Sequence, residues 1–195
     1  VDEKTAGELD VEIIRRTTGG GAMFVEPENI ITYSIYAPLE LVSGMSTIES
    51  YAFLDGWVVE ALRSLGIDAY YEPINDISSA NGKIGGAAQA RSHGAVLHHT
   101  TMSYDIDAAK MLRLLRTGQE KISDKAIASA EKRVGPIKRQ TDLPREEVMK
   151  RMIETFDRQA GGRLEEDRIS PGEMAEAGDL MRERYGSPAW IHSIP

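Results

Sequence analysis

The chain has 195 residues, 41% of them hydrophobic, which suits one globular domain of ordinary size with a substantial core. Its net charge of −8 argues against a nucleic-acid partner, because phosphate recognition requires a basic face. The sequence contains no cysteine, which excludes disulfides, a thiolate nucleophile and cysteine metal ligands within it and fits a cytoplasmic protein. Its start, VDEKTAGELD, is not a signal peptide, and no apolar run is long enough to make the membrane a partner.

The first quarter of the chain is predicted to be rich in strands. Three short stretches with β-branched or aromatic residues are predicted strands: 10–16, 23–26 and 29–38. Between the first two, TTGGGA (17–22) is predicted to be irregular, because three consecutive glycines leave the backbone free. A helix is then expected from about Thr47 to Leu65, with Ser46 or Thr47 as its N-cap and Gly66 at its end.

The remainder combines further strands with a helical second half. Strands are expected at 67–74 and 94–104, with a hairpin over 76–89 that turns at Asn81-Gly82. Helical periodicity, acidic first turns or caps indicate four later helices: one from Asp105 or Asp107 to Leu115, then 125–133, 141–156 and 170–186. The last begins with a capping box formed by Ser170 and Glu173. This order predicts an α+β fold.

Two glycine-rich segments carry the candidate chemistry, RRTTGGGA (15–22) and NGKIGGAAQ (81–89). Glycine lets backbone N–H groups approach a phosphate closely, although neither segment matches a P-loop or a Rossmann fingerprint. Arg16 could hold a phosphate or carboxylate through two parallel hydrogen bonds. Lys83 offers a compact charge beside small residues that leave room for a ligand. Tight turns and a solvated surface lysine remain open as alternatives.

Two further groups of polar residues are candidates for the functional site. His98 and His99 are neighbours on a predicted strand, so their side chains point to opposite faces and do not readily bind one metal ion. We expect a core or hydrogen-bonded role for one of them. Asp76 could hold a divalent cation beside phosphates, or it could simply cap a turn.

Several motifs together resemble the lipoate–protein ligase A family, which has the biotin/lipoate protein ligase catalytic domain. They are RRTTGGGAMF (15–24), NI (29–30), NDI (75–77), NGKIGGAAQ (81–89) and HHTT (98–101). The tail ERYGSPAW (183–190) also resembles the end of that catalytic domain. The resemblance covers roughly Val11 to Trp190, and motifs in register are far more specific than any one alone.

The resemblance implies a fold, an activity and partners. The implied fold is a mixed sheet packed with helices, related to class II aminoacyl-tRNA synthetases, with residues 1–195 as a single catalytic domain that lacks the N-terminal part of the family domain. The implied activity uses ATP and Mg²⁺ to convert the substrate lipoate into lipoyl-adenylate. The lipoyl group then passes to a lysine of a lipoyl domain, in 2-oxoacid dehydrogenases or glycine cleavage protein H. Some family members need a separate accessory ligase subunit.

The resemblance also implies site residues. Lys83 matches the family's essential lysine, which touches the acyl carbonyl and the phosphate. The residues matched to ATP and lipoyl-adenylate binding are Arg16, Gly20, Gly21, Ala22, Met23, Phe24, Asn75, Asp76 and Lys83. Those matched to lipoate binding are Lys83, Gly86 and Ala88, and Asp76 is the candidate Mg²⁺ ligand.

Some positions depart from the family pattern, and functions other than a lipoate–protein ligase remain as alternatives. Thr18 stands where serine is usual, Val25-Glu26 where His-Asp is common, and Thr100 where glycine is usual. An octanoyl or lipoyl transferase of the same fold would need a cysteine nucleophile, which this sequence lacks. The Gly-Arg-Gly-Arg signature of biotin ligases is also absent. A non-catalytic domain that binds lipoate or nucleotide is the third alternative, although the intact Arg16 and Lys83 argue against it.

Overall fold

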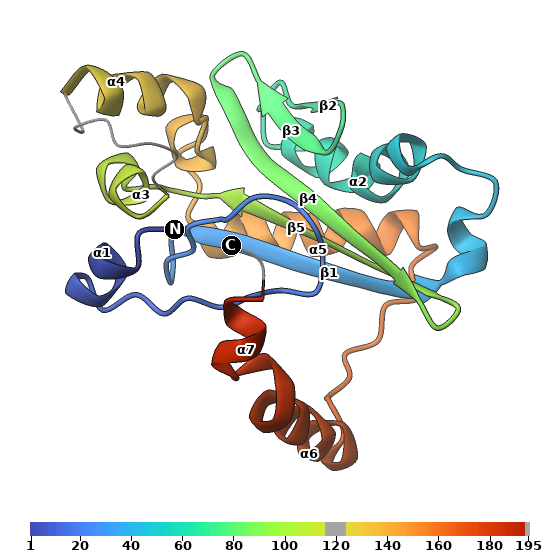
Figure 1. Ribbon diagram of the computed structural model, residues 1–195. Coiled ribbons are helices and arrows are strands. Elements are labelled where there is room, and N and C mark those ends of the chain that lie inside the picture. Colours follow the sequence, from blue (N-terminus) through green and yellow to red (C-terminus); the bar gives the residue numbers. More distant parts are fainter. Residues whose placement is uncertain (116–123, 194–195) are drawn as a thin grey trace.

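The computed structural model describes residues 1–115 and 124–193, which are arranged around a five-stranded sheet (Figure 1). The strand order is β1-β5-β4-β3-β2. The strands are β1 (Ile30–Pro38), β2 (Tyr70–Glu72), β3 (Asp76–Ser79), β4 (Gly82–Ser92) and β5 (Ala95–Ser103). All four neighbouring pairs are antiparallel, so the expected mixed sheet is corrected to an antiparallel one. Three of these pairs, β2-β3, β3-β4 and β4-β5, are formed by strands that follow each other through short turns, which join antiparallel neighbours.

Helices occupy one face of this sheet and its ends. They are α1 (Glu3–Glu8), α2 (Thr47–Ser64), α3 (Ala108–Leu114), α4 (Asp124–Arg133), α5 (Arg145–Gln159), α6 (Pro171–Leu180) and α7 (Pro188–Ile191). In Figure 1, α2 and α5 lie behind the sheet, whereas the segment 10–26 crosses its near face. Ser170 forms the expected capping box of α6 with Glu173, and Ser46, one of the two expected N-caps of α2, forms another with Glu49. Within residues 1–115 and 124–193, no helix combines the length and apolarity needed to cross a membrane.

Most of the expected elements are confirmed, and the α+β class with them. The predicted strand 67–74 is shorter, because only Tyr70–Glu72 is paired. The hairpin turn consists of Ala80 and Asn81, while Gly82, at φ 112°, already belongs to β4. The short helix α1 was not expected. The single domain over 1–195 stays a prediction, and residues 116–123 and 194–195 lie outside the described residues.

The strands predicted at 10–16 and 23–26 are wrong, since neither segment is part of the sheet. β-branched residues favour an extended backbone, but a strand also needs a neighbour for its hydrogen bonds. Side-chain contacts fix these segments instead. Phe24 packs with Ala6 of α1 and Leu114 of α3 in a small separate cluster. The irregular backbone expected between the two segments is confirmed.

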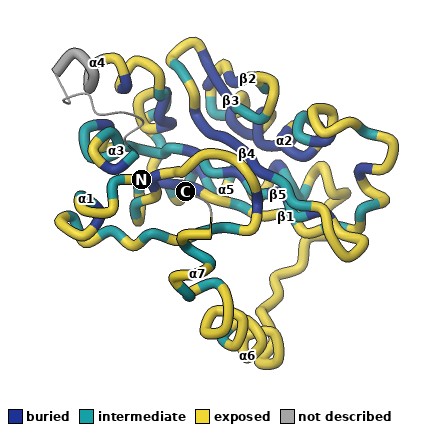
Figure 2. The backbone as a smooth tube through the Cα atoms, in the orientation of Figure 1, coloured by how far each residue is buried: buried dark blue, intermediate teal, exposed yellow. Residues whose placement is uncertain are grey.

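The main core lies between the sheet and the helices α2 and α5. Fully buried members come from all of these elements, among them Leu62, Val58, Ile77, Ile84, Met102 and Val148. Figure 2 shows the consequence, with one side of α2 and the middle of β4 buried while the helix α6 is exposed. The sheet therefore has one face sealed by apolar packing and one face that is available for other contacts.

A polar cluster sits inside this core and ties α2 to the sheet. The Oδ1 atom of Asp55 accepts hydrogen bonds from Tyr33 (2.5 Å), His98 Nε2 (2.8 Å) and Thr100 (2.7 Å). The side chains of Asp55, His98 and Thr100 are fully buried. Burial and the nearby Asp55 raise the pKa of Tyr33 well above its usual value, so its hydroxyl remains a donor. Gln89 Nε2 donates to the other ring nitrogen of His98 (3.1 Å), which confirms the hydrogen-bonded role expected for one histidine.

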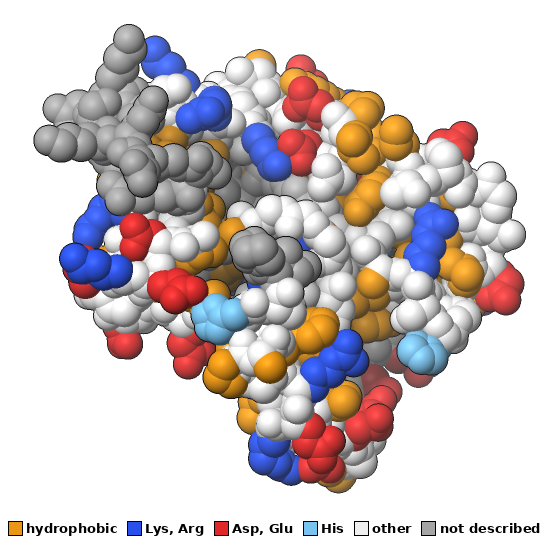
Figure 3. Space-filling model, viewed as in Figure 1, with side chains coloured by type: hydrophobic (Ala, Val, Ile, Leu, Met, Phe, Trp, Pro, Cys, Tyr) orange, Lys and Arg blue, Asp and Glu red, His pale blue; other side chains and the backbone are white. Residues whose placement is uncertain are grey.

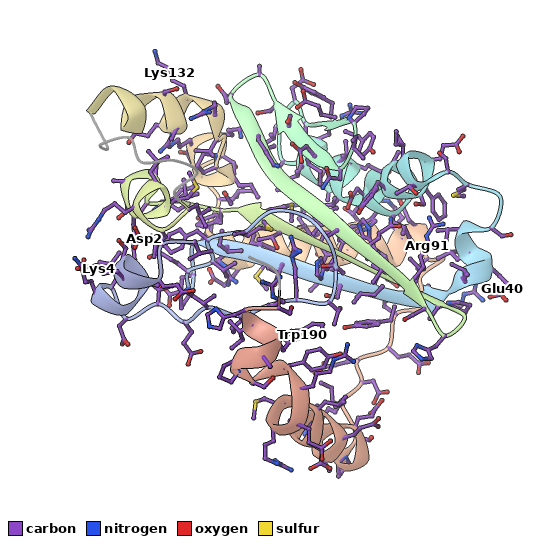
Figure 4. The ribbon with its side chains drawn as sticks, viewed as in Figure 1. Asp2, Lys4, Glu40, Arg91, Lys132 and Trp190 are labelled. Atoms are coloured by element: carbon purple, nitrogen blue, oxygen red, sulfur yellow. The ribbon has the colours of Figure 1, made fainter. Side chains whose placement is uncertain are left out.

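The C-terminal arm, residues 163–193, extends away from the sheet and contacts the segment 10–16 through α7. Trp190 Nε1 donates to the carbonyl of Arg15 (2.9 Å), and Arg15 Nε donates to the carbonyl of Ile191 (2.7 Å). Figure 4 shows Trp190 at the junction of the arm with the body of the molecule. Figure 3 shows apolar side chains exposed among charged ones on this arm. The arm thus anchors the residue that directly precedes Arg16.

Gly56, in the interior of α2, is expected to be a site where a larger residue adds stability. A Cβ atom there would meet nothing within 4 Å. Gly56→Ala should therefore raise the free energy of unfolding by about 0.5–1 kcal/mol, because alanine loses less backbone entropy in a helix. Urea unfolding measures this change. Gly85→Ala is the contrasting variant, since its Cβ would lie 2.7 Å from both Met102 Cγ and the Thr101 oxygen. Equal stability changes of the same sign would contradict this packing.

Candidate active site

The glycine-rich loop that follows Arg16 is closed by the guanidinium group of Arg16. One terminal nitrogen donates to the carbonyls of Thr18 (2.8 Å) and Gly19 (2.7 Å), and the other to Gly21 (2.8 Å). Gly20 has φ 107°, and a Cβ there would be only 3.0 Å from the guanidinium. Glycine is needed at this position for both reasons. The loop therefore holds a cation at its centre, in contact with backbone oxygens.

His99 attaches this loop to the open face of the sheet. Its Nε2 atom is 2.8 Å from the hydroxyl of Thr18, within hydrogen-bond distance. Burial, together with the nearby charge of Arg16, lowers the pKa of His99, which favours a neutral ring. His98, the preceding residue, points into the core, which confirms the opposite orientations expected from strand geometry.

A β-bulge in β4 determines where Lys83 points. The register pairs Ile77 with Gly85 but Ser78 with Lys83, so it skips Ile84. An extra residue reverses the alternation of side chains beyond it. Ile84 consequently enters the core, where it is almost completely buried, while Lys83 turns to the open face.

Lys83 and Asp76 form an ion pair on that face. The distance from Lys83 Nζ to Asp76 Oδ1 is 2.7 Å, and both side chains are partly exposed. The lysine end lies directly over Gly86, because a Cβ at Gly86 would be 3.2 Å from Nζ. A side chain at position 86 would therefore displace the ammonium group from this position.

A row of small residues runs from Lys83 along the open face. Gly86 pairs with Thr101, and Ala88 pairs with His99, so both lie on the face to which the glycine-rich loop is attached. The structure therefore brings together the residues that the sequence suggests for lipoate, Lys83, Gly86 and Ala88. The Arg16 loop lies on the same side of the sheet, tethered through His99.

The residues suggested for binding ATP and lipoyl-adenylate differ in how far they are exposed to solvent. Gly20, Gly21, Ala22 and Met23 are exposed, whereas Phe24 is buried and its ring lies 5.5 Å from the Lys110 ammonium. The Phe24 side chain thus serves packing. Asn75 is bound to β4, since its Nδ2 donates to the Ala87 carbonyl (2.5 Å) and its own carbonyl accepts from the Ala87 N–H (2.8 Å). Asn75 positions the neighbouring Asp76.

Sequence reasoning missed the contacts that come from the segment after α4. The Gly135 N–H donates to the Lys83 carbonyl (2.8 Å), and Gln140 contacts Ser79 of β3 and Asn81 of the hairpin turn. These partners are more than 50 residues apart along the chain. No local pattern could indicate them. The buried Asp55 was missed for the same reason, because its partners lie on other elements.

Lys83 lines neither of two hollows found in the described part of the chain. A hollow of about 310 Å³ lies near Glu40 and Arg91, at the end of β4 remote from Lys83 (Figure 4). Another of about 260 Å³ lies between β1 and α5. Among the described residues, no three His, Asp or Glu side chains form a metal site. A Mg²⁺ ion at Asp76 would therefore take its other ligands from phosphates and water, as this ion commonly does.

The sequence signature of the lipoyl protein ligase A/B catalytic domain matches residues 1–157. The chain belongs to this family. The octanoyltransferase LipM of Halalkalibacterium halodurans is 25% identical over 222 residues, covering 96% of this chain and 80% of LipM. This family membership confirms the resemblance to lipoate–protein ligases and makes the protein an enzyme of the ligase and transferase family.

Two solved structures of the family are similar to the whole chain. One belongs to an archaeal lipoylation system of Thermoplasma acidophilum, with a bi-partite lipoate protein ligase and its E2 lipoyl domain. It has a TM-score of 0.89 and 28% identity, and the match covers 100% of this chain and 76% of that chain. The other, a lipoate-protein ligase A bound with ATP, has a TM-score of 0.83 and 25% identity over 98% of this chain and 76% of that chain. The α+β fold of this catalytic domain is thereby confirmed.

Proposed function

We propose that this chain is an ATP-dependent lipoate–protein ligase. The observation that carries the proposal is the position of Lys83, which the bulge at Ile84 turns onto a row of small residues on the open face. A cation beside a narrow apolar row suits a substrate with a carboxylate at the end of an aliphatic chain. Similarity to a ligase bound with ATP supports the nucleotide as co-substrate.

In the first proposed step, a carboxylate oxygen of lipoate attacks the α-phosphorus of ATP. A new carbon–oxygen–phosphorus link forms, the bond from the α-phosphorus to the bridging oxygen breaks, and pyrophosphate leaves. Both reactants are anions, so a fixed ammonium group lowers their repulsion and stabilises the charge of the transition state. Lys83 supplies this charge. Arg16 binds the phosphates by exchanging its backbone carbonyl partners for phosphate oxygens.

In the second step, a lysine amine attacks the carbonyl carbon of lipoyl-adenylate. An amide forms, AMP leaves with the bridging oxygen, and the amine loses a proton to water. Lys83 stabilises the negative charge that develops on the carbonyl oxygen. The proposed acceptor is a lipoyl domain, in 2-oxoacid dehydrogenases or glycine cleavage protein H. The bi-partite Thermoplasma system supports an accessory ligase subunit as a further partner.

Mg²⁺ is part of this proposal, with Asp76 as its protein ligand. Asp76 fits this role because its carboxylate is partly exposed, next to Lys83, and provides the hard oxygen that Mg²⁺ prefers. When bound, the ion would neutralise phosphate charge. Asp76 also has a second role that does not require Mg²⁺. Its carboxylate orients the Lys83 ammonium group by direct contact.

An acyl transferase is the second candidate, because of the similarity to LipM. A transferase that holds its acyl group as a thioester needs a cysteine, and none is present in the 195 residues. The two activities differ in their donor. The ligase should modify a lipoyl domain with lipoate and ATP. Modification from an octanoyl thioester without ATP would instead support the transferase, and binding without either reaction would support a non-catalytic domain.

Arg16→Ala is expected to raise the KM for ATP about 10- to 100-fold, with a smaller change in kcat. The reason is the loss of charge-assisted hydrogen bonds to phosphate, each of about 1.5–3 kcal/mol. Steady-state kinetics with varied ATP measure the effect. Arg63→Ala is the matched control, because Arg63 also donates to a backbone carbonyl, that of Ala69, but lies on α2. An unchanged KM for ATP in Arg16→Ala would remove Arg16 from the nucleotide site.

A further inference from the structure

The side chain of Gln140 connects β3 and the turn of the Lys83 hairpin to the segment after α4. Its Oε1 atom accepts from the Ser79 hydroxyl (2.8 Å) and from Asn81 Nδ2 (3.2 Å). Its Nε2 atom donates to the carbonyls of Gly135 (2.7 Å) and Pro136 (3.5 Å). Every polar atom of this amide is therefore in use, and all of them act on the turn or on the segment beside it.

A backbone contact between two glycines continues this connection. The Gly135 N–H donates to the Lys83 carbonyl (2.8 Å), and Lys83 forms a parallel bridge with Val134. A Cβ atom on Gly82 would lie 2.8 Å from the Arg133 carbonyl, and one on Gly135 would lie 2.8 Å from the Gly82 carbonyl. Backbones can come this close only without side chains at either position.

The hairpin needs external support because of the bulge that orients Lys83. Bulges interrupt the ladder of hydrogen bonds locally. The register skips Ile84, so the pairs Ser78–Lys83 and Ser79–Gly82 are separated from the rest of β3 and β4. The segment that contacts them is itself fixed, since Ile137 is fully buried in the main core. A rigid part of the fold thus holds a weakly paired hairpin end.

We propose that Gln140 is a positioning residue for Lys83. This inference rests on the proposed ligase function, in which Lys83 must face the reacting carboxylate and phosphate. Gln140 keeps the hairpin end, and with it the Lys83 backbone, at a fixed distance from Gly86 and Asp76. A misplacement of about 1 Å at a reacting centre can lower the rate about 100-fold, even when binding is intact.

The test compares Gln140→Leu with Gln159→Leu. Gln159 also uses its amide, which donates to Glu60 (2.5 Å), but it lies at the end of α5. In Gln140→Leu, kcat for lipoyl-adenylate formation is expected to fall about 10- to 100-fold with KM for ATP changed less than about twofold. The NMR signal of the Lys83 side chain, assigned with Lys83→Arg, should shift and broaden in Gln140→Leu and stay unchanged in Gln159→Leu.

A second variant guards against a general loss of folding. Ser79→Ala removes one hydrogen bond of the Gln140 amide. In the double variant with Gln140→Leu that hydrogen bond is already lost, so kcat should be no lower than in Gln140→Leu alone. An unchanged Lys83 signal, or an unchanged kcat in Gln140→Leu of an active parent, would overturn the positioning role. If the parent forms no lipoyl-adenylate, the proposed function fails, whereas a shifted Lys83 signal would still support the positioning role.

Discussion

Lys83→Ala is expected to lower the rate of lipoyl-adenylate formation by at least about 100-fold, because it removes the charge that faces the phosphate and carboxylate. Transfer from supplied lipoyl-adenylate should fall as well, since the same ammonium group faces the carbonyl oxygen in the second step. The melting temperature should stay close to that of the parent, because partly exposed ion pairs such as Lys83–Asp76 contribute only about 0–1 kcal/mol. Both half-reactions and a thermal melt measure these outcomes.

Lys138→Ala is the matched control for this prediction. Lys138 forms a similar exposed pair, with its Nζ atom 2.8 Å from Asp105 Oδ2, but belongs to neither glycine-rich segment. It should retain activity. Lys83→Arg should not restore the rate, because a planar guanidinium is wider than an ammonium group and would crowd Gly86. Full activity of Lys83→Ala in both half-reactions would refute the mechanism.

Asp55→Ala is expected to give the largest loss of stability. Tyr33, His98 and Thr100 all donate to Asp55 Oδ1, so the variant leaves buried donors without an acceptor. Removing one member of such a buried cluster costs about 3 kcal/mol or more. For a domain of this size, that loss lowers the melting temperature by roughly 6–12 °C. Thermal unfolding monitored by circular dichroism measures the shift.

Asp55→Asn separates the lost acceptor from the lost volume. Asparagine keeps an oxygen that can accept from the same donors, and its amide nitrogen takes the place of Oδ2, which has no hydrogen-bond partner among the described residues. This variant should therefore lose clearly less stability than Asp55→Ala. Equal losses would show that shape and charge, rather than the accepted hydrogen bonds, determine the contribution of Asp55.

Short-range patterns in the sequence were sufficient for much of this fold. The Ser170–Glu173 spacing correctly predicted the start of α6, because a capping box involves residues only three apart. Ser46, one of the two expected N-caps, begins α2. The close pairing of β3 with β4 was also predictable from the polar turn between them. The resemblance of the motifs singled out Arg16 and Lys83 as candidate site residues, and both lie on one side of the sheet.

Features that depend on distant residues could not be predicted. Segments 10–16 and 23–26 have strand-like composition, but composition does not report whether a neighbouring strand is available. A bulge is a shift of one residue in pairing, so the orientation of Lys83 could not be derived from strand alternation. Gln140 contacts Ser79 across 61 positions of the chain. Only the folded structure brings these residues together.

The central claim is that this chain activates lipoate with ATP, and an oxygen-18 experiment tests it most directly. The chain, alone and with any subunit that co-purifies with it, is incubated with ATP, a lipoyl domain and lipoate labelled at both carboxylate oxygens. Our account predicts that mass spectrometry detects AMP with one oxygen-18 atom for each lipoyl group transferred, and that Lys83→Ala abolishes this product. Lipoyl transfer without labelled AMP would contradict an adenylate intermediate and the ligase function proposed for this protein.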